Sequence, residues 1–363
     1  MTSPRDRFRR PARLAILFRS WSTGLSPGSV GGRPTHLGNV GQSALGVPWS
    51  PGARIVLLLV SLLAALDPAT ARAAEGGASA RLVTINGGRK MYLDCRGSGS
   101  PTVVLVAGLK ASATDWNTAE TQAPTVFSGV AKFTRVCAYD RPGTPVGEKP
   151  SRSDPVQQPT TAQDAVLDLH ALLRAAKEPA PYVLVGHSYG GLIARLYAST
   201  YPDDVSGLVL IDALTEGLQE AQTPEQWAVQ RTLLEGEIAE SVALYPDLER
   251  IDPDRSFDQI RAAPQLRPLP LIVLSADRPW GPQISAMIAE GKLPATVPVD
   301  FGYVIDAAQK RGQEKLARLV PNAKHITNTK SGHEIHKEQP QLVIGAIREV
   351  VDAVRSGHRQ RAR

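Results

Sequence analysis

The segment that constrains this chain most is the pentapeptide Gly186-His187-Ser188-Tyr189-Gly190. The run before it, Pro181–Val185, is short and apolar, which predicts a buried strand. The run after it, Gly191–Thr200, has apolar residues at helical spacing. A serine between a strand and a helix lies on a sharp turn, where glycines are needed because side chains would collide with the neighbouring strand and helix. This setting favours a nucleophilic serine; the alternative is a glycine-rich turn without a chemical role.

Strands and helices alternate from residue 80 onward. We predict strands at about 81–86, 90–95, 102–107, 133–139, 181–186, 207–212, 270–276 and 323–328. Thr160 and Gln163 have capping-box spacing for a helix through Ala176, and Pro340 opens a last helix. Each of these helices has an apolar stripe that we expect to be buried. The stripe of the first helix is Ala162, Val166, Leu169 and Leu173, and that of the last helix is Val343, Ile347, Val350 and Val354. The alternation predicts an α/β fold with a mostly parallel eight-stranded sheet and helices on both faces.

The interval between the sixth and seventh predicted strands, residues 213–269, is too long for a simple connection. It contains helix-like stretches such as Thr223–Leu234. Because reactive groups of parallel sheets gather at the carboxyl ends of strands, a long segment there predicts a helical cap over the site. The alternative is a surface excursion with no part in catalysis.

The first 74 residues differ from the rest and form a predicted leader, followed by one catalytic domain over residues 75–363. Residues 1–50 are rich in Arg, Pro, Gly and Ser, which indicates a disordered stretch. Arg54, the apolar run Ile55–Leu66 and Ala71-Arg72-Ala73 resemble the three parts of an export signal. We therefore expect a secreted or extracytoplasmic protein cleaved near Ala73. A membrane contact is expected only if the leader is not cleaved; an accessory helix is the remaining alternative.

The positive charge of the chain belongs to this leader. The whole chain has 41 basic and 35 acidic residues; the leader holds nine and two of these, which leaves 32 and 33. The remainder is thus nearly neutral, and its sequence offers no basic patch that would indicate a nucleic-acid partner.

Two cysteines, Cys95 and Cys137, lie in separate predicted strands. In an exported protein they are expected to form a disulfide. Two buried thiols are the alternative that the sequence leaves open.

A serine hydroxyl needs a base within hydrogen-bond reach, and the base needs an orienting carboxylate. His333 is the preferred base because it lies on a predicted loop between the last strand and the last helix, whereas His325 lies inside a predicted strand. His333 and His336 also have H-x-x-H spacing, but no further cysteine, histidine or carboxylate set supports a metal site.

Residues 80–356 resemble the α/β-hydrolase fold superfamily. Four pieces carry the resemblance, and they are Gly186–Gly191 as a nucleophile elbow, Tyr139–Gly143 as the loop after the fourth strand, Val205–Asp212 as the sixth strand and Ser331–His336 as the histidine loop. The resemblance implies a serine hydrolase with a Ser-His-Asp triad, like an esterase or lipase, and a covalent acyl-enzyme. It does not fix a substrate, because this fold supports many chemistries.

Two aspartates compete for the third place in the triad. Asp212 ends the sixth predicted strand, and Asp277 follows the seventh, which is the commoner place in the family. Asp212 is preferred because Arg278-Pro279-Trp280 occupy the positions where the family's seventh-strand acid usually stands.

The oxyanion hole is expected to consist of two backbone N–H groups. One belongs to Tyr189, next after the nucleophile, and the other to Leu109 in the loop after the third strand. In the family that loop commonly reads His-Gly-x, whereas here Ala107 replaces the histidine, so the sequence does not indicate what holds the loop.

The expected activity is hydrolysis of a carboxylic ester or similar acyl bond in a small molecule, catalysed by Ser188, His333 and Asp212. Fold relatives that cleave carbon–halogen or epoxide bonds use Asp as the nucleophile, and Ser188 argues against both. A cofactor-free haloperoxidase-like activity and a non-catalytic ligand-binding member of the fold are the alternatives. No sequence motif for a cofactor is present, and we expect none.

Overall fold

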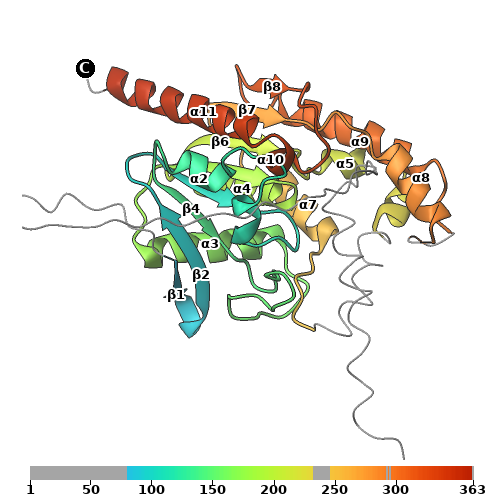
Figure 1. Cartoon of the computed structure of the whole chain (residues 1–363), viewed down its shortest axis with the longest axis horizontal. Coiled ribbons are helices and arrows are strands. Elements are labelled where there is room, and N and C mark those ends of the chain that lie inside the picture. Colours follow the sequence, from blue (N-terminus) through green and yellow to red (C-terminus); the bar gives the residue numbers. More distant parts are fainter. Residues whose placement is uncertain (1–79, 232–245, 292, 294–295, 362–363) are drawn as a thin grey trace, which may run out of the picture. The chain divides into compact units, whose positions relative to one another are not determined.

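The computed structural model describes residues 80–231, 246–291, 293 and 296–361. A single sheet forms the centre of this part of the chain (Figure 1). Its strands are β1 (Arg81–Thr84), β2 (Lys90–Arg96), β3 (Thr102–Val106), β4 (Val136–Tyr139), β5 (Tyr182–His187), β6 (Val205–Ile211), β7 (Leu271–Leu274) and β8 (Lys324–Ile326). All eight strands predicted from the sequence are confirmed.

The α-helices are α2 (Val126–Val130), α3 (Ala162–Ala176), α4 (Tyr189–Thr200), α5 (Gly217–Glu220), α7 (Pro253–Ala262), α8 (Gly281–Ala289), α9 (Phe301–Leu316), α10 (Ile335–Glu338) and α11 (Pro340–Arg361). Two short 3-10 segments, η2 (Asn86–Gly88) and η3 (Ala113–Asn117), lie in loops.

The strand order in the sheet is β1-β2-β4-β3-β5-β6-β7-β8. Strand β2 pairs antiparallel with both β1 and β4, and every later pairing is parallel. The parallel strands β3 to β8 therefore end at one edge of the sheet, where loops from distant parts of the sequence meet. The predicted mostly parallel, eight-stranded α/β sheet is confirmed.

Helices cover both faces of the sheet because alternate residues of each strand point to opposite sides. Leu184 and Leu208 belong to one apolar cluster with residues of α3 and α4. Their strand neighbours Val183 and Val209 belong to another cluster with residues of α2 and α11. Strands that are buried on both faces explain the near-continuous apolar runs in the sequence.

The two predicted helix stripes are buried as expected, at positions 162, 166, 169, 173 and 343, 347, 350, 354. The predicted capping box, however, was placed one residue too early. Thr161 accepts a hydrogen bond from the N–H of Asp164, and the Asp164 carboxylate accepts one from the N–H of Thr161. The earlier candidate, Thr160, forms an isolated bridge with Ile251 instead. A tertiary contact therefore decided which threonine begins α3.

The interval 213–269 contains α5, a helical stretch at 224–231 and α7, while residues 232–245 lie outside the described residues. A second long interval, 275–323, separates β7 from β8 and contains α8 and α9, which we did not expect as a separate excursion. These two helices bury Ile284, Leu293, Val297 and Phe301 in a small apolar cluster apart from the main core.

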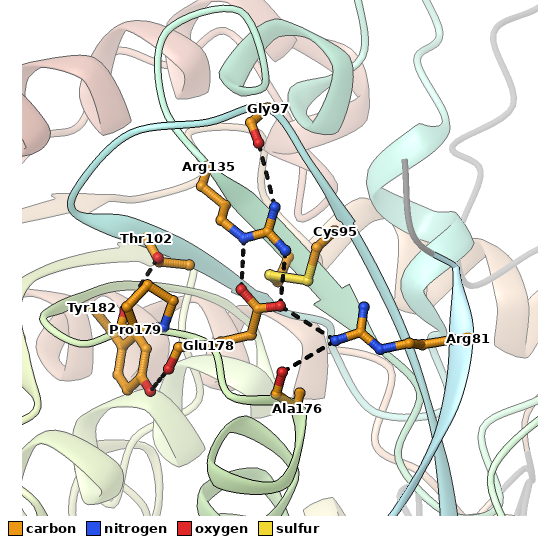
Figure 2. The surroundings of a disulfide bond; sticks show 10 residues. Arg81, Cys95, Gly97, Thr102, Arg135, Ala176, Glu178, Pro179 and Tyr182 are labelled. Atoms are coloured by element: carbon orange, nitrogen blue, oxygen red, sulfur yellow. Dashed lines mark hydrogen bonds and ion pairs between the residues drawn. A yellow bond between two sulfur atoms is a disulfide. The ribbon is translucent and has the colours of Figure 1, made fainter. Parts of the chain in front are cut away.

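Cys95 and Cys137 form a disulfide that joins β2 to β4, where the two residues lie directly opposite each other. Figure 2 shows this bond beside an ion pair between Arg135 and Glu178. The structure thus resolves the choice that the sequence left open between a disulfide and two thiols.

The predicted leader, residues 1–74, lies outside the described residues. Within the described part of the chain, no helix has both the length and the apolar character needed to span a bilayer.

We predict that the disulfide stabilises the fold without taking part in the chemistry. Changing both cysteines to alanine should lower the free energy of unfolding by about 2–4 kcal/mol, since the bond closes a loop with a sequence separation of 42 residues. Urea unfolding of the double variant measures the loss, and wild-type protein treated with reductant is the control. Thiol alkylation without reductant should leave both cysteines unmodified. An unchanged midpoint in the variant and in the reduced protein would contradict this prediction.

Candidate active site

Ser188 lies between β5 and α4 in a backbone conformation that L-residues rarely adopt, with φ 53° and ψ −125°. Its N–H donates to the carbonyl of Ile211 at 3.1 Å, and its own carbonyl accepts from Gly191 at 2.9 Å and Leu214 at 2.8 Å. These bonds hold the strained turn in place. The serine side chain is left half-buried at the carboxyl edge of the sheet.

The glycines around Ser188 are required by close backbone contacts. A Cβ atom on Gly190 would lie 2.1 Å from the carbonyl oxygen of Val106, and one on Gly186 would lie 2.4 Å from the carbonyl oxygen of Gly190. Any side chain at these two positions would push β3, β5 and α4 apart. The glycine pattern is therefore explained by packing of the turn, as the sequence predicts.

His333 is hydrogen-bonded to Asp212, its Nδ1 lying 2.6 Å from Oδ2 of the aspartate. Asp212 immediately follows β6 and is 2% exposed, while the His333 side chain is 22% exposed. The second carboxylate oxygen of Asp212 accepts from the N–H of Ala276 at 3.2 Å, and the side chain of Gln309 on α9 also bonds to the Asp212 carboxylate. Asp212 is therefore held from two sides.

Burial and pairing have opposite effects on these two groups. Burial lowers the pKa of His333, but the hydrogen bond and negative charge of Asp212 outweigh it, so the pKa of His333 lies above its ordinary value. Burial likewise raises the pKa of Asp212, but the hydrogen bond from His333 outweighs it and lowers that pKa overall. The pair consequently favours an ionised aspartate beside a histidine that readily accepts a proton.

Asp277, the other candidate acid, has a different set of partners. Its carboxylate accepts from the N–H groups of Lys330 and Ser331, both at 2.9 Å. Its own N–H donates to the carbonyl of Ser331 at 3.1 Å. Asp277 therefore ties down the loop that leads to His333, and Asp212 is the carboxylate that bonds to the imidazole.

His187 links the serine turn to the histidine loop. It is buried, and its Nε2–H donates to the backbone carbonyl of His333 at 3.0 Å. The ring centroids of His187 and His333 are 4.6 Å apart. Burial lowers the pKa of His187 well below its ordinary value, so the ring stays neutral. This contact brings the loop of His333 against the turn of Ser188.

His336 does not share a site with His333, contrary to the H-x-x-H alternative. Its Nε2 lies 2.8 Å from Oδ2 of Asp115, in a group of possible ligand atoms that also includes His187 and Glu334. The ammonium of Lys337 lies 2.6 Å from Asp115 and 2.9 Å from Glu334. The two carboxylates thus already have a cation between them, and we interpret the group as a buried polar network behind the histidine loop.

The loop after β3, Ala107–Lys110, lies against the serine turn. A Cβ atom on Gly108 would be 3.0 Å from the His187 ring and 3.3 Å from Cβ of Ser188. The guanidinium of Arg141 donates to the carbonyls of Ala107 at 2.8 Å and Gly108 at 2.5 Å. Arg141 therefore holds this loop, for which the sequence indicated no anchoring residue.

Sequence reasoning missed several residues of this site. Arg141 stands inside the quoted segment Tyr139–Gly143, so its motif was visible although its contacts were not. Its partner Glu249, and Gln309 near Asp212, had no sequence signal, because they come from the long intervals after β6 and β7. Trp280 was noted only for its place after the seventh strand, and its ring centroid lies 5.7 Å from that of His333.

Comparison with known proteins agrees with this fold. Residues 103–346 match the model of the Alpha/beta hydrolase family. The uncharacterized protein YqjL of Bacillus subtilis (strain 168) is 27% identical over 259 residues, which are 70% of this chain and 85% of that protein.

Two solved structures show the same fold at low sequence identity. The haloalkane dehalogenase DatA from Agrobacterium tumefaciens C58 covers 77% of this chain and 97% of its own, with a TM-score of 0.54 and 16% identity. A putative aryl esterase from Burkholderia cenocepacia covers 77% of this chain and 100% of its own, with a TM-score of 0.50 and 18% identity. With the family match over most of the described residues, the chain belongs to the α/β-hydrolase family.

We predict that Asp212→Asn and Asp277→Asn differ strongly in turnover. An amide at 212 would favour the wrong tautomer of His333, with a loss of up to about ten-thousandfold in kcat, whereas Asp277→Asn should cost stability or a modest fraction of activity. Steady-state rates on an activated ester measure this difference.

The pH profile is the control for this prediction. Removing the Asp212 charge lowers the pKa of His333, so the acid limb of kcat/KM should move to lower pH in Asp212→Asn and stay in place in Asp277→Asn. A dead Asp277→Asn beside an active Asp212→Asn would reverse the assignment.

Proposed function

We propose that this protein is a serine hydrolase that cleaves a carboxylic ester or a similar acyl bond in a small molecule. The observation that carries the proposal is the strained turn of Ser188, with the loop of His333 packed against it and His333 hydrogen-bonded to Asp212 at the end of β6. A nucleophile, a base and an orienting carboxylate in one place are the parts that acyl transfer requires.

In the proposed reaction the Ser188 hydroxyl attacks the acyl carbon while His333 takes its proton. Asp212 holds the imidazole through Nδ1, so that Nε2 is the nitrogen that accepts the proton, and it stabilises the imidazolium that forms. His333 then returns the proton to the leaving alcohol, which gives a covalent acyl-enzyme. Water activated by His333 releases the acid in a second round of the same steps.

The backbone N–H groups of Tyr189 and Leu109 are the proposed donors to the negative oxygen of the tetrahedral intermediate. Tyr189 is the first residue of α4, where the helix dipole also favours negative charge. Leu109 follows Gly108, whose close approach to Ser188 supports a position beside the reacting carbon.

The identity of the residue at 188 separates this proposal from other reactions of the fold. A haloalkane dehalogenase and a putative aryl esterase both have a similar fold. Relatives that cleave carbon–halogen bonds use aspartate as the nucleophile, whereas this chain has serine, which favours acyl transfer.

We also propose that the interval 213–269 acts as a cap over the active site. The hydrogen bond from the N–H of Leu214 to the carbonyl of Ser188 supports this, because it places the beginning of the interval beside the nucleophile.

We predict that Ser188→Ala removes nearly all ester hydrolysis while the protein stays folded. The covalent step is lost, and the expected decrease in kcat is on the order of 10⁶ in a well-formed triad. A chain-length series of nitrophenyl esters, read on the purified wild type and the variant, measures the decrease and the acyl preference. His333→Ala should do comparable damage. His325→Ala should do much less, because His325 lies in β8 and bonds to Ser275, directly after β7.

The outcome against this proposal is wild-type turnover in Ser188→Ala. A wild-type protein that neither hydrolyses any ester of the series nor reacts with a fluorophosphonate probe would instead support the non-catalytic alternative, a capped pocket that only binds its ligand.

We further propose that the protein is exported and that its leader is removed by cleavage near Ala73. The signal-like leader and the Cys95–Cys137 disulfide support this, because disulfides persist in oxidising compartments. The extracytoplasmic protein is predicted to begin near Ala74, which N-terminal peptide mass spectrometry of the secreted fraction measures. Full-length protein in the membrane fraction would indicate an uncleaved anchor, and intact residues 1–50 on a cytoplasmic protein would contradict export.

A further inference from the structure

The loop that carries Leu109 is held by a buried ion pair. Arg141, directly after β4, donates from Nη1 to the carbonyl of Ala107 and from Nη2 to the carbonyl of Gly108. The same guanidinium donates to Glu249, with Nε at 2.5 Å from Oε1 and Nη2 at 3.1 Å from Oε2. Both side chains are almost completely buried, at 3% and 2% exposure.

Glu249 also bonds to the loop directly. Its Oε2 accepts from the N–H of Lys110 at 2.6 Å. The two peptide units on either side of Leu109 are therefore both held, one through the Gly108 carbonyl and one through the Lys110 N–H. The carboxylate and the guanidinium together fix the backbone on both sides of a single residue.

The geometry of the peptide bond connects this clamp to the chemistry. In a trans peptide the carbonyl of Gly108 and the N–H of Leu109 belong to one plane and point in opposite directions. A guanidinium that fixes the direction of the carbonyl therefore also fixes the direction of the N–H. The positive charge at the oxygen additionally polarises the peptide unit and strengthens its N–H as a donor.

Arg141 contacts the other half of the proposed oxyanion hole as well. Its guanidinium lies 5.5 Å from the ring centroid of Tyr189, within range of a cation–π contact. Burial opposes the charge of Arg141, but the Glu249 carboxylate outweighs this cost and keeps the pKa of Arg141 above its ordinary value. The arginine is thus charged and fixed, bonded to the loop that carries Leu109 and close to the Tyr189 ring.

We propose that Arg141 and Glu249 are positioning residues that set the direction of the Leu109 N–H in the oxyanion hole, in place of the histidine that this loop lacks. The inference rests on the proposed function, since it concerns the same reaction. The proposal also gives the interval after β6 a role in positioning the oxyanion hole, because Glu249 belongs to this interval. The backbone N–H of Glu249 donates to the carbonyl of Gly143 at 3.0 Å, which holds Glu249 in place.

The chain contains a matched control at the other end of β4. Arg135 directly precedes that strand and pairs with Glu178 in the same two-pronged way, with Nε at 2.6 Å and Nη2 at 2.8 Å (Figure 2). This pair is also largely buried, at 22% and 3% exposure, and it contacts Gly97 and Arg81 rather than the serine turn. Its loss should affect folding alone.

The experiment compares Glu249→Gln with Glu178→Gln in the full chain. Each variant leaves an arginine without its carboxylate, so both should lower the melting temperature. Glu249→Gln should also lower kcat on nitrophenyl esters by roughly tenfold to a hundredfold with KM changed less than about threefold, because a misdirected donor weakens only the transition state. Glu178→Gln should leave kcat unchanged at a temperature where both variants are folded.

Two further measurements separate positioning from a general loss of structure. The affinity for phenylboronic acid, which forms a tetrahedral adduct with the nucleophile, should fall in Glu249→Gln by about the factor seen in kcat. Arg141→Lys keeps the charge but not the planar fork, so it should repeat the loss in kcat, whereas Arg135→Lys should not. This second pair keeps the test decisive if Glu249→Gln does not fold.

The outcomes distinguish the two proposals. An active Glu249→Gln or Arg141→Lys, with wild-type kcat and boronate affinity, overturns the positioning role while leaving the hydrolase proposal intact. Equal losses of kcat in the 249 and 178 variants also overturn it, because the effect is then one of stability. Wild-type turnover in Ser188→Ala, or a wild-type protein without ester turnover or boronate binding, refutes the proposed function and this inference with it.

Discussion

The structure depends on one strained residue, because the backbone at Ser188 turns from β5 into α4 in a conformation that costs energy. The strain persists because the surroundings leave no alternative: a Cβ on Gly190 would already meet the Val106 carbonyl at 2.1 Å, and three backbone hydrogen bonds hold Ser188 itself. Val106 belongs to the neighbouring strand β3 and the Ile211 carbonyl to β6, while Leu214 follows β6. The turn that raises the hydroxyl therefore exists only when the parallel strands around it are assembled.

Buried charged side chains also hold the loops at this edge of the sheet together. Arg141 with Glu249 and Asp115 with Lys337 each bring opposite charges from distant segments into one largely buried contact, and Asp212 brings a carboxylate against His333. Removing one partner leaves an uncompensated charge, so such pairs resist rearrangement even where they add little net stability. At this edge they join loops that backbone hydrogen bonds alone would hold less firmly.

The sequence predicted the strands and the helix stripes because they follow local periodicity, and the position of Ser188 because its flanking glycines form a short, recognisable pattern. It also preferred Asp212 to Asp277, and the structure has Asp212 bonded to His333 and Asp277 to the loop of Lys330 and Ser331. The capping box was wrong by one residue, because Thr160 and Thr161 are equivalent in pattern and only a contact with Ile251 separates them.

By itself, the sequence determined the α/β alternation and the strand–serine–helix turn, since hydrophobic periodicity and the glycine pattern around Ser188 can both be recognised within a few residues. The tertiary structure alone decided which distant groups meet: Cys95 with Cys137, Gln309 with Asp212, and Glu249 with Arg141. No spacing along the chain encodes these pairings. These pairings follow from the strand order and from where the long intervals after β6 and β7 pack against the sheet. A buried charge there is stable only when the fold places an opposite charge beside it.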